Sequence, residues 1–188
     1  MNSLILALIS YFIGSFPTAY LFDRNIFKKG TGNMGAFNFM AENKKIIQSI
    51  LILVIDVLKG IIIASLSLLF APNYASIMIS VVSGIIGHCY SPWVGFKGGR
   101  GLALACGAAL ILEPVFLIII LIILGILYLI IRDYIKAGLV SIPFIIALIF
   151  LMNLSSDFLI LSIICAILIA HKDFIKNYAA PILKSIFK

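Results

Sequence analysis

The chain has 188 residues, of which 63% are hydrophobic and only 11% charged. A soluble domain carries about 25% charged residues, so the composition excludes an ordinary water-soluble protein and indicates one whose solvent is lipid. The formal net charge of +7 favours the membrane surface and anionic substrates as partners. Nucleic acid is disfavoured, because no basic cluster is interleaved with aromatic residues on a polar scaffold.

Seven apolar runs follow one another along the chain, and a membrane-spanning helix needs about 20 apolar residues, or about 17 at the short end. We expect helices at about Leu4–Phe22, Ile46–Phe70, Ser76–Cys89, Leu102–Leu112, Val115–Ile131, Gly138–Met152 and Asp157–Ala170. The third, fourth and sixth runs are short. The pattern predicts an all-α, polytopic integral membrane protein with about seven transmembrane helices, and residues 1–188 are treated as one transmembrane domain.

The positive charges are segregated along the chain. All but one of the 14 lysines and arginines lie after the first, third or fifth helix or in the tail that begins at His171. The other links carry Glu113 and Asp157 but no Lys or Arg. Under the positive-inside rule, this arrangement predicts a cytoplasmic C-terminus and an N-terminus outside.

Lys59 is the exception, because it lies inside the second helix, three residues after Asp56. Residues at this spacing share a helix face and can pair. Ionisable groups within a span are costly, and they usually face the protein interior or a watery cleft. Two interpretations stay open: a structural ion pair that locks helix packing, or a charged wall of a substrate site.

Two glycine-rich segments lie in links predicted to be cytoplasmic. The first runs from Gly30 to Asn38 and includes Thr31, Gly32 and Asn33; the second is Gly95-Phe96-Lys97-Gly98-Gly99-Arg100-Gly101, directly before an apolar helix. Glycine exposes backbone N–H groups to a close ligand, and a helix N-terminus flanked by cations is an anion site. The spacing differs from a P-loop, so the pattern indicates a phosphate group without implying ATP. Each segment alone is equally compatible with a plain turn.

The two histidines, His88 and His171, end the third and the seventh predicted helices, both on the predicted cytoplasmic side. A single interfacial histidine is usually a packing residue. Two histidines bordering one basic pocket are candidates for phosphate contact or proton transfer.

The three cysteines, Cys89, Cys106 and Cys165, have no spacing suited to a disulfide framework or a zinc site. No Ser-His-Asp, Cys-His or paired-carboxylate arrangement can be argued from the sequence. We therefore expect neither a metal nor a cofactor, and a covalent enzyme intermediate is not favoured.

Six motifs, in this order along almost the whole chain, resemble the PlsY family of bacterial acyl-phosphate:glycerol-3-phosphate acyltransferases. They are Gly14-Ser15-Phe16-Pro17, Gly30 to Asn38, Asp56-Val57-Leu58-Lys59-Gly60, Gly87-His88, Gly95 to Gly101 and Ala170-His171-Lys172. The most specific is the string from Gly95 to Gly101 placed after Gly-His. The resemblance implies a seven-helix enzyme of the bacterial cytoplasmic (inner) membrane that uses neither acyl-CoA nor a metal.

The activity that the resemblance implies is acyl transfer from acyl phosphate to the 1-hydroxyl of glycerol 3-phosphate, which gives lysophosphatidic acid for phospholipid synthesis. Acyl phosphate, glycerol 3-phosphate and membrane lipids are then the partners, and the oligomeric state is left open, with a monomer compatible. The expected catalytic residues are His171, Thr31 and Asn33. The expected substrate-binding residues are Lys97, Gly98, Gly99, Arg100, Gly101, Gly32, Asn38, His88, Lys59, Asp56 and Lys172.

The sequence also departs from the family pattern. Thr31 replaces the usual serine and keeps a hydroxyl, whereas Lys172 replaces an arginine and keeps only its charge. The other departures are Ala41 for an arginine, Phe37 for a threonine, Phe174 for an asparagine and Asn177 for a second arginine; the closing glutamate of the family has no match. Ala41 and Phe174 motivate a non-catalytic lipid-phosphate-binding or regulatory protein as an alternative. The Asp56 and Lys59 pair motivates a small anion transporter as another.

Overall fold

The structure, a computed structural model, describes residues 2–174, with the backbone alone at residues 134–135, 165–166 and 168–174. Within that part of the chain all regular structure is helical, and one isolated bridge joins Ser91 and Lys97. The predicted all-α class is therefore confirmed for the described residues. The chain divides into two compact units, Met1–Pro114 and Val115–Lys188, and each is described by itself.

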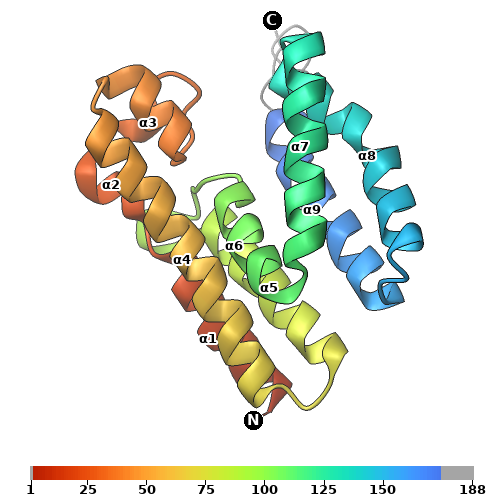
Figure 1. Ribbon diagram of the computed structural model, residues 1–188. Helices are drawn as coiled ribbons and strands as arrows, with labels where there is room; N and C mark the ends of the chain where they lie inside the picture. Colours follow the sequence, from red (N-terminus) through yellow and green to blue (C-terminus); the bar gives the residue numbers. More distant parts are fainter. Residues whose placement is uncertain (1, 175–188) are drawn as a thin grey trace, which may run out of the picture. The chain divides into compact units, whose positions relative to one another are not determined.

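The first unit is built from helices of very different lengths, which Figure 1 shows. Its elements are α1 (Ser3–Ser15), α2 (Thr18–Phe22), α3 (Ala36–Asn43), α4 (Ile46–Phe70), α5 (Tyr74–Cys89) and α6 (Leu102–Leu112), with 3₁₀ turns η1 (Ile26–Lys28) and η2 (Pro92–Val94). α1 packs mainly against α5, and α4 packs mainly against α6. The short α2 and α3 both contact α4.

The second unit contains α7 (Pro114–Ile131), α8 (Tyr134–Leu151) and α9 (Ser156–Phe174). α8 packs against α9. Phe116 of α7 meets Phe158 of α9 edge to face, with ring centroids 5.1 Å apart, and both side chains are buried.

Six of the seven predicted helices are helical in their described parts, apart from Met152, which lies in a turn after α8, and α4 and α6 have the predicted bounds. α5 begins two residues earlier than predicted, because the Asn73 side chain caps it by accepting a hydrogen bond from the Ser76 N–H (2.9 Å). α9 continues through His171 to Phe174, past the predicted end at Ala170. α3 was not predicted, since it lies within the polar link.

The first predicted helix is interrupted between α1 and α2. Proline lacks an N–H and disfavours the helical conformation for the residue before it, and Phe16, before Pro17, has φ −57° and ψ 121°. The chain becomes helical again at Thr18. The break leaves the Phe16 carbonyl oxygen outside the helical hydrogen-bond ladder, available to a side chain of another helix.

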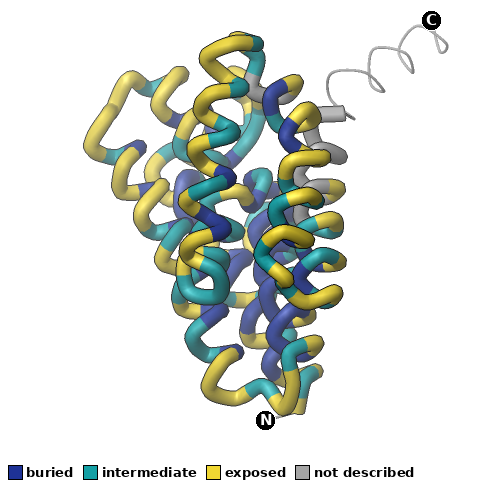
Figure 2. The backbone as a smooth tube through the Cα atoms, turned by 45° about the vertical axis from the view of Figure 1, so that its right-hand side comes forward, coloured by how far each residue is buried: buried dark blue, intermediate teal, exposed yellow. Residues whose placement is uncertain are grey.

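The first unit combines a buried apolar core, which includes Leu6, Ile52 and Ile85, with an apolar outer surface. Large apolar residues such as Leu51, Ile62 and Leu69 of α4 are exposed, whereas the serines of α1, α4 and α5 are largely buried. Figure 2 shows buried and exposed positions alternating along the helices. Apolar residues facing outward and polar residues facing inward are typical of helices in lipid.

Three helical segments of the described chain are long and apolar enough to cross a membrane: Ser3–Phe22, Ile46–Phe70 and Pro114–Ile131. Tyr74–Cys89, Leu102–Leu112 and Lys136–Leu151 are shorter apolar helices. These features support a membrane-spanning protein. The number of seven spans and their orientation stay predictions.

Glycines bring the paired helices of the first unit into backbone contact. A Cβ added at Gly60 of α4 would meet the Leu104 carbonyl oxygen of α6, and one added at Gly107 of α6 would meet the Val57 carbonyl oxygen of α4. Between α1 and α5, a Cβ at Gly14 would meet the backbone of Gly84 in the same way. Small residues allow such close approach between helices in lipid, where apolar burial alone does not drive association.

We expect Gly60→Ala to destabilise the protein by about 1–3 kcal/mol, the usual cost of overpacking, because the new methyl meets backbone rather than a flexible side chain. Gly125→Ala in α7 is the control, since its added Cβ meets no described atom within 4 Å. Thermal unfolding in detergent micelles should show a lower Tm for Gly60→Ala only. Equal Tm values for the two variants would contradict the close packing of α4 on α6.

Candidate functional site

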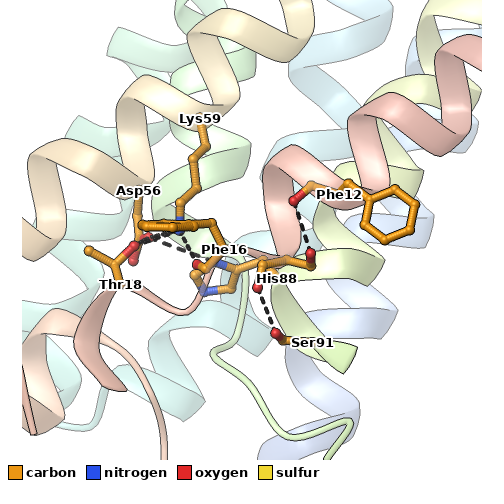
Figure 3. Close-up of polar contacts among 8 residues, drawn as sticks. Phe12, Phe16, Thr18, Asp56, Lys59, His88 and Ser91 are labelled. Atoms are coloured by element: carbon orange, nitrogen blue, oxygen red, sulfur yellow. Dashed lines mark hydrogen bonds and ion pairs between the residues drawn. The ribbon is translucent and has the colours of Figure 1, made fainter. Parts of the chain in front are cut away.

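A buried ion pair links α4 to the break between α1 and α2. The Lys59 ammonium donates to Asp56 Oδ1 (2.7 Å), to Thr18 Oγ1 (2.6 Å) and to the Phe16 carbonyl oxygen (2.6 Å). Thr18 Oγ1 in turn donates to Asp56 Oδ1 (3.0 Å). Thr18, Asp56 and Lys59, which we call the Lys59 cluster, are buried to 2–5% exposure, and Figure 3 shows them converging on one point.

This geometry bears on the two interpretations of Asp56 and Lys59. An ammonium has three N–H donors, and each donor of Lys59 has a partner within the protein. A group buried in this way has no donor left for an anionic substrate. The structure therefore favours the structural ion pair over the charged wall of a substrate site.

His88 lies between the Lys59 cluster and the second glycine-rich segment. Its Nδ1 is 3.9 Å from Asp56 Oδ1, and its side chain is only 3% exposed; Figure 3 shows His88 beside the Lys59 cluster. Its carbonyl oxygen accepts a hydrogen bond from the Gly99 N–H (3.0 Å). A Cβ added at Gly99 would meet Nε2 of its imidazole.

The segment Gly95–Gly101 is held as a compact loop before α6. The Ser91 N–H donates to the Lys97 carbonyl oxygen (3.1 Å), and the Phe96 N–H donates to the Ser91 carbonyl oxygen (2.8 Å). Gly101, the N-cap of α6, has φ 85° and ψ 0°, a left-handed conformation that glycine adopts at little cost.

The N-terminus of α6 has the properties of an anion site. Its helical ladder begins with the Ala105 N–H donating to the Gly101 carbonyl oxygen (2.9 Å), so the N–H groups of residues 102–104 precede the ladder. No side chain caps this end. The side chain of Lys97 is exposed and that of Arg100 is half-buried, and both stand directly before α6. N–H groups at a helix start, flanked by cations, attract phosphate.

The first glycine-rich segment is organised by the side chain of Asn38. Its Oδ1 accepts a hydrogen bond from the Thr31 N–H (2.9 Å), and its Nδ2 donates to the Asn33 carbonyl oxygen (2.8 Å) and to that of Lys29 (3.4 Å). Asn38 is 7% exposed, so it shapes the loop from inside. Thr31 is exposed, and Asn33 Oδ1 is buried with no hydrogen-bond partner among the described residues.

The two glycine-rich segments come together in the first unit. The Lys97 ammonium lies over the ring of Phe27, 5.9 Å from its centroid. Phe27, in the turn η1, packs against a small core that includes Met34 of the first segment and Phe39 of α3. The cation–π contact thus places the Lys97 loop beside the loop that carries Thr31 and Asn33.

The remaining predicted site residues lie in the second unit. His171 and Lys172 lie in the last turn of α9, where the structure describes the backbone only. Their side chains fall outside the described residues, as does the whole of Asn177. Their roles stay predictions.

Sequence reasoning missed Thr18, the Phe16 carbonyl oxygen and Phe27. The proline after Phe16 was a usable signal, because it lacks an N–H and disfavours a helical conformation for the residue before it. Phe27 gave no signal, since its contact with Lys97 joins positions 70 residues apart through the tertiary fold.

No group of three or more metal-binding side chains occurs among the described residues. Cys89 is buried and Cys106 is half-buried. The expectation that no metal or cofactor is needed stays a prediction.

We expect Asp56→Ala to destabilise the protein by about 3–5 kcal/mol, because it leaves the Lys59 ammonium buried without its counter-charge. The double variant Asp56→Leu with Lys59→Met removes both charges and should lie closer to the wild type. Thermal unfolding in detergent, followed through the fluorescence of Trp93, which is the only tryptophan, would rank the three proteins. A single variant as stable as the double variant would contradict a buried ion pair.

A second ion pair, outside the apolar helices, joins Lys29 to Asp23 Oδ2 (2.6 Å), and Lys29 also donates to Asn43 Oδ1 (3.1 Å). The hydrogen bond from Lys29 lowers the pKa of Asp23 below its ordinary value of 3.8; burial opposes this shift, and the Asn25 N–H supports it. A carboxyl with a lowered pKa in the folded state stabilises that state above the unfolded-state pKa. The stabilisation is lost as the pH falls through the folded-state pKa.

We therefore expect Asp23→Asn to cost up to about 1 kcal/mol at neutral pH. The difference from the wild type should shrink as the pH falls below 3.8 and vanish below the lower folded-state pKa. Unfolding by denaturant in detergent, measured at neutral and at acidic pH, would test this. A difference that grows on acidification would contradict the assignment.

Comparison with known proteins gives consistent results. The family model described as "Glycerol-3-phosphate acyltransferase" matches residues 4–180. A glycerol-3-phosphate acyltransferase of Ehrlichia chaffeensis is 30% identical over 177 residues, which is 90% of this chain and 89% of that protein. One of Helicobacter pylori is 32% identical over 124 residues, which is 60% of this chain and 56% of that protein.

Two solved structures share the fold. Both are crystal structures of PlsY, described as an integral membrane glycerol 3-phosphate acyltransferase. The glycerol 3-phosphate form superposes with a TM-score of 0.79 at 22% identity, covering 98% of this chain and 94% of that chain. The lysophosphatidic acid form has a TM-score of 0.77 at 23% identity and covers 98% and 93%.

Proposed function

We propose, from the premise that this chain belongs to the glycerol-3-phosphate acyltransferase family, that it transfers a fatty acyl group from acyl phosphate to the 1-hydroxyl of glycerol 3-phosphate. The product is lysophosphatidic acid, for phospholipid synthesis. The observation that carries the proposal is the meeting of the two glycine-rich segments through Lys97 and Phe27, at the N-terminus of α6.

The proposed enzyme lies in the bacterial cytoplasmic (inner) membrane. It crosses the membrane with seven helices as one catalytic domain over residues 1–188, with the N-terminus outside and the C-terminus in the cytoplasm. The three long apolar helices and the three shorter ones support this topology, as does the segregation of lysine and arginine to alternate links.

Glycerol 3-phosphate is proposed to bind at the start of α6. Its phosphate would meet the N–H groups of the first helical turn, with Lys97 and Arg100 as the neighbouring cations. The backbone of Gly98, Gly99 and Gly101 shapes this loop, although the Gly99 N–H is already bound to the His88 carbonyl oxygen. Gly32 belongs to the facing loop, beside Thr31 and Asn33.

In the proposed reaction the 1-hydroxyl oxygen of glycerol 3-phosphate attacks the acyl carbon of acyl phosphate. A new ester bond forms, the bond between the acyl carbon and the phosphate oxygen breaks, and inorganic phosphate leaves as the hydroxyl proton is taken up by a weak base or by phosphate itself. Because acyl phosphate is already activated, positioning and stabilisation of the oxyanion are the main requirements. Thr31, Asn33 and His171 are the residues proposed for these tasks, with Lys172 as a further substrate contact.

We further propose that a nearby lysine replaces the arginine that the resemblance expects at Ala41. Lys29 is engaged by Asp23 and Asn43, so it is not a candidate. Lys28, Lys44 and Lys45 have exposed side chains. Lys44 caps the C-terminus of α3, the helix that contains Ala41, and we propose it for this role.

The transport alternative rested on Asp56 and Lys59. The Lys59 ammonium donates its hydrogen bonds to groups of the protein itself, which does not favour transport of an anion along this pair. The non-catalytic alternative rested on Ala41 and Phe174. It predicts binding of acyl phosphate or glycerol 3-phosphate without transfer, and the assay below separates it from the enzyme.

We expect the purified protein in lipid to release inorganic phosphate from acyl phosphate only when glycerol 3-phosphate is present. Lys97→Ala and His171→Ala should each lower kcat/KM at least about tenfold, because a lost charge-assisted hydrogen bond costs about 1.5–3 kcal/mol. Gly125→Ala, in α7, serves as the control. If the protein binds both substrates without releasing phosphate, the non-catalytic binding protein is the correct function. If the wild type shows no turnover and neither variant differs from it, the proposed function is wrong.

A further inference from the structure

His88 connects two features that are far apart in the sequence, the Lys59 cluster and the loop Gly95–Gly101. On one side its Nδ1 faces the Asp56 carboxylate at 3.9 Å. On the other side its imidazole Nε2 lies where a Cβ of Gly99 would stand. The imidazole therefore occupies the space between Asp56 and the Gly99 backbone.

The main chain of His88 also contacts the loop Gly95–Gly101. Its carbonyl oxygen accepts the Gly99 N–H (3.0 Å), and a Cβ at Gly98 would meet the carbonyl oxygens of His88 and Cys89. Neither Gly98 nor Gly99 has a positive φ. These two positions thus need glycine because of close contact with His88 and Cys89, not because of backbone conformation.

The Lys59 cluster that His88 faces is anchored to the end of α1. Lys59 holds the Phe16 carbonyl oxygen (2.6 Å). Ser91, at the start of the loop region, donates to the Ser15 carbonyl oxygen (2.6 Å), and Trp93 Nε1 donates to Ser15 Oγ (2.8 Å). The last carbonyl groups of α1 therefore fix both the cluster and the segment that leads into the loop.

Burial decides between two roles for His88. A residue that contacts substrate or moves a proton must reach the substrate, but the His88 side chain is 3% exposed and its Nε2 edge is covered by Gly99. The sequence predicted a substrate contact for His88. The geometry instead indicates that it acts through the loop.

We propose that His88 is a positioning residue, wedged between Asp56 and Gly99, which transmits the fixed geometry of the Lys59 cluster to the Gly98–Gly99 backbone. The inference rests on the proposed function, in which this loop binds the phosphate of glycerol 3-phosphate. Disturbing the wedge displaces the phosphate site while leaving the site of the acyl donor in place. It therefore weakens binding of glycerol 3-phosphate and has little effect on kcat or on KM for acyl phosphate.

The test is a double-mutant cycle of His88→Ala and Gly99→Ala. Gly99→Ala drives a methyl into the imidazole, and His88→Ala removes the support, so each should raise Kd and KM for glycerol 3-phosphate about tenfold. The double variant makes room for the new methyl. Because neighbouring groups couple, its Kd should be no higher than that of the worse single variant, about tenfold below the product of the two effects.

Two further variants keep the test decisive. His88→Asn keeps a polar group facing Asp56 and should bind glycerol 3-phosphate more tightly than His88→Ala; it also replaces His88→Ala in the cycle if that variant does not fold. Gly125→Ala, whose added Cβ meets no described atom within 4 Å, should match the wild type. Kd is measured by calorimetric titration with glycerol 3-phosphate in detergent, and KM and kcat by phosphate release.

The outcomes separate this inference from the proposed function. If the protein binds glycerol 3-phosphate but transfers no acyl group, and the two variants have coupled effects on Kd, the proposed enzyme activity is wrong and the positioning role of His88 is supported. Effects that simply multiply, unchanged Kd in both single variants, or losses confined to kcat would overturn the positioning role in an active enzyme. No binding of glycerol 3-phosphate by the wild type would overturn both.

Discussion

The ammonium group of Lys59 lies inside an apolar helical bundle, where an unpaired charge is very costly. It is accommodated because three acceptors converge on it: the Asp56 carboxylate, the Thr18 hydroxyl and the Phe16 carbonyl oxygen. The Phe16 carbonyl oxygen, which also accepts a hydrogen bond from the Thr18 N–H (3.0 Å), lies at the break where Pro17 disfavours a helical conformation for the residue before it. This buried charge thus links the end of α1 and the start of α2 to α4.

The rest of the candidate site is built outward from this point. His88 packs between Asp56 and Gly99, and the loop that contains Gly99 leads directly into α6. The start of α6 and Lys97 form a positive end to which a phosphate group is attracted. Lys97 then meets Phe27 of the facing loop. The site therefore combines a rigid, buried polar support with a solvent-facing, cationic binding surface, and different residues serve the two purposes.

Much of the fold follows from local chemistry. The lengths of the apolar runs predicted α4 and α6 to the residue, because a helix in lipid must satisfy its own backbone and ends where polar residues begin. The same reasoning failed at α1, where a proline interrupts an apolar run, and at α3, whose short helix lies in a polar link and depends on contact with α4. Hydropathy alone does not register either feature.

By itself the sequence determined the helical class, the family to which the chain belongs and the two glycine-rich segments, since each of these depends on residue types at short spacing. It left Asp56 and Lys59 open between packing and substrate binding, and it placed His88 at the substrate. Only the tertiary structure shows the burial and the hydrogen bonds of these side chains, because they arise from contacts between residues about 40 apart in the chain. The sequence pattern indicates which residues are chemically capable, and tertiary packing determines which of their side chains are buried and which are exposed.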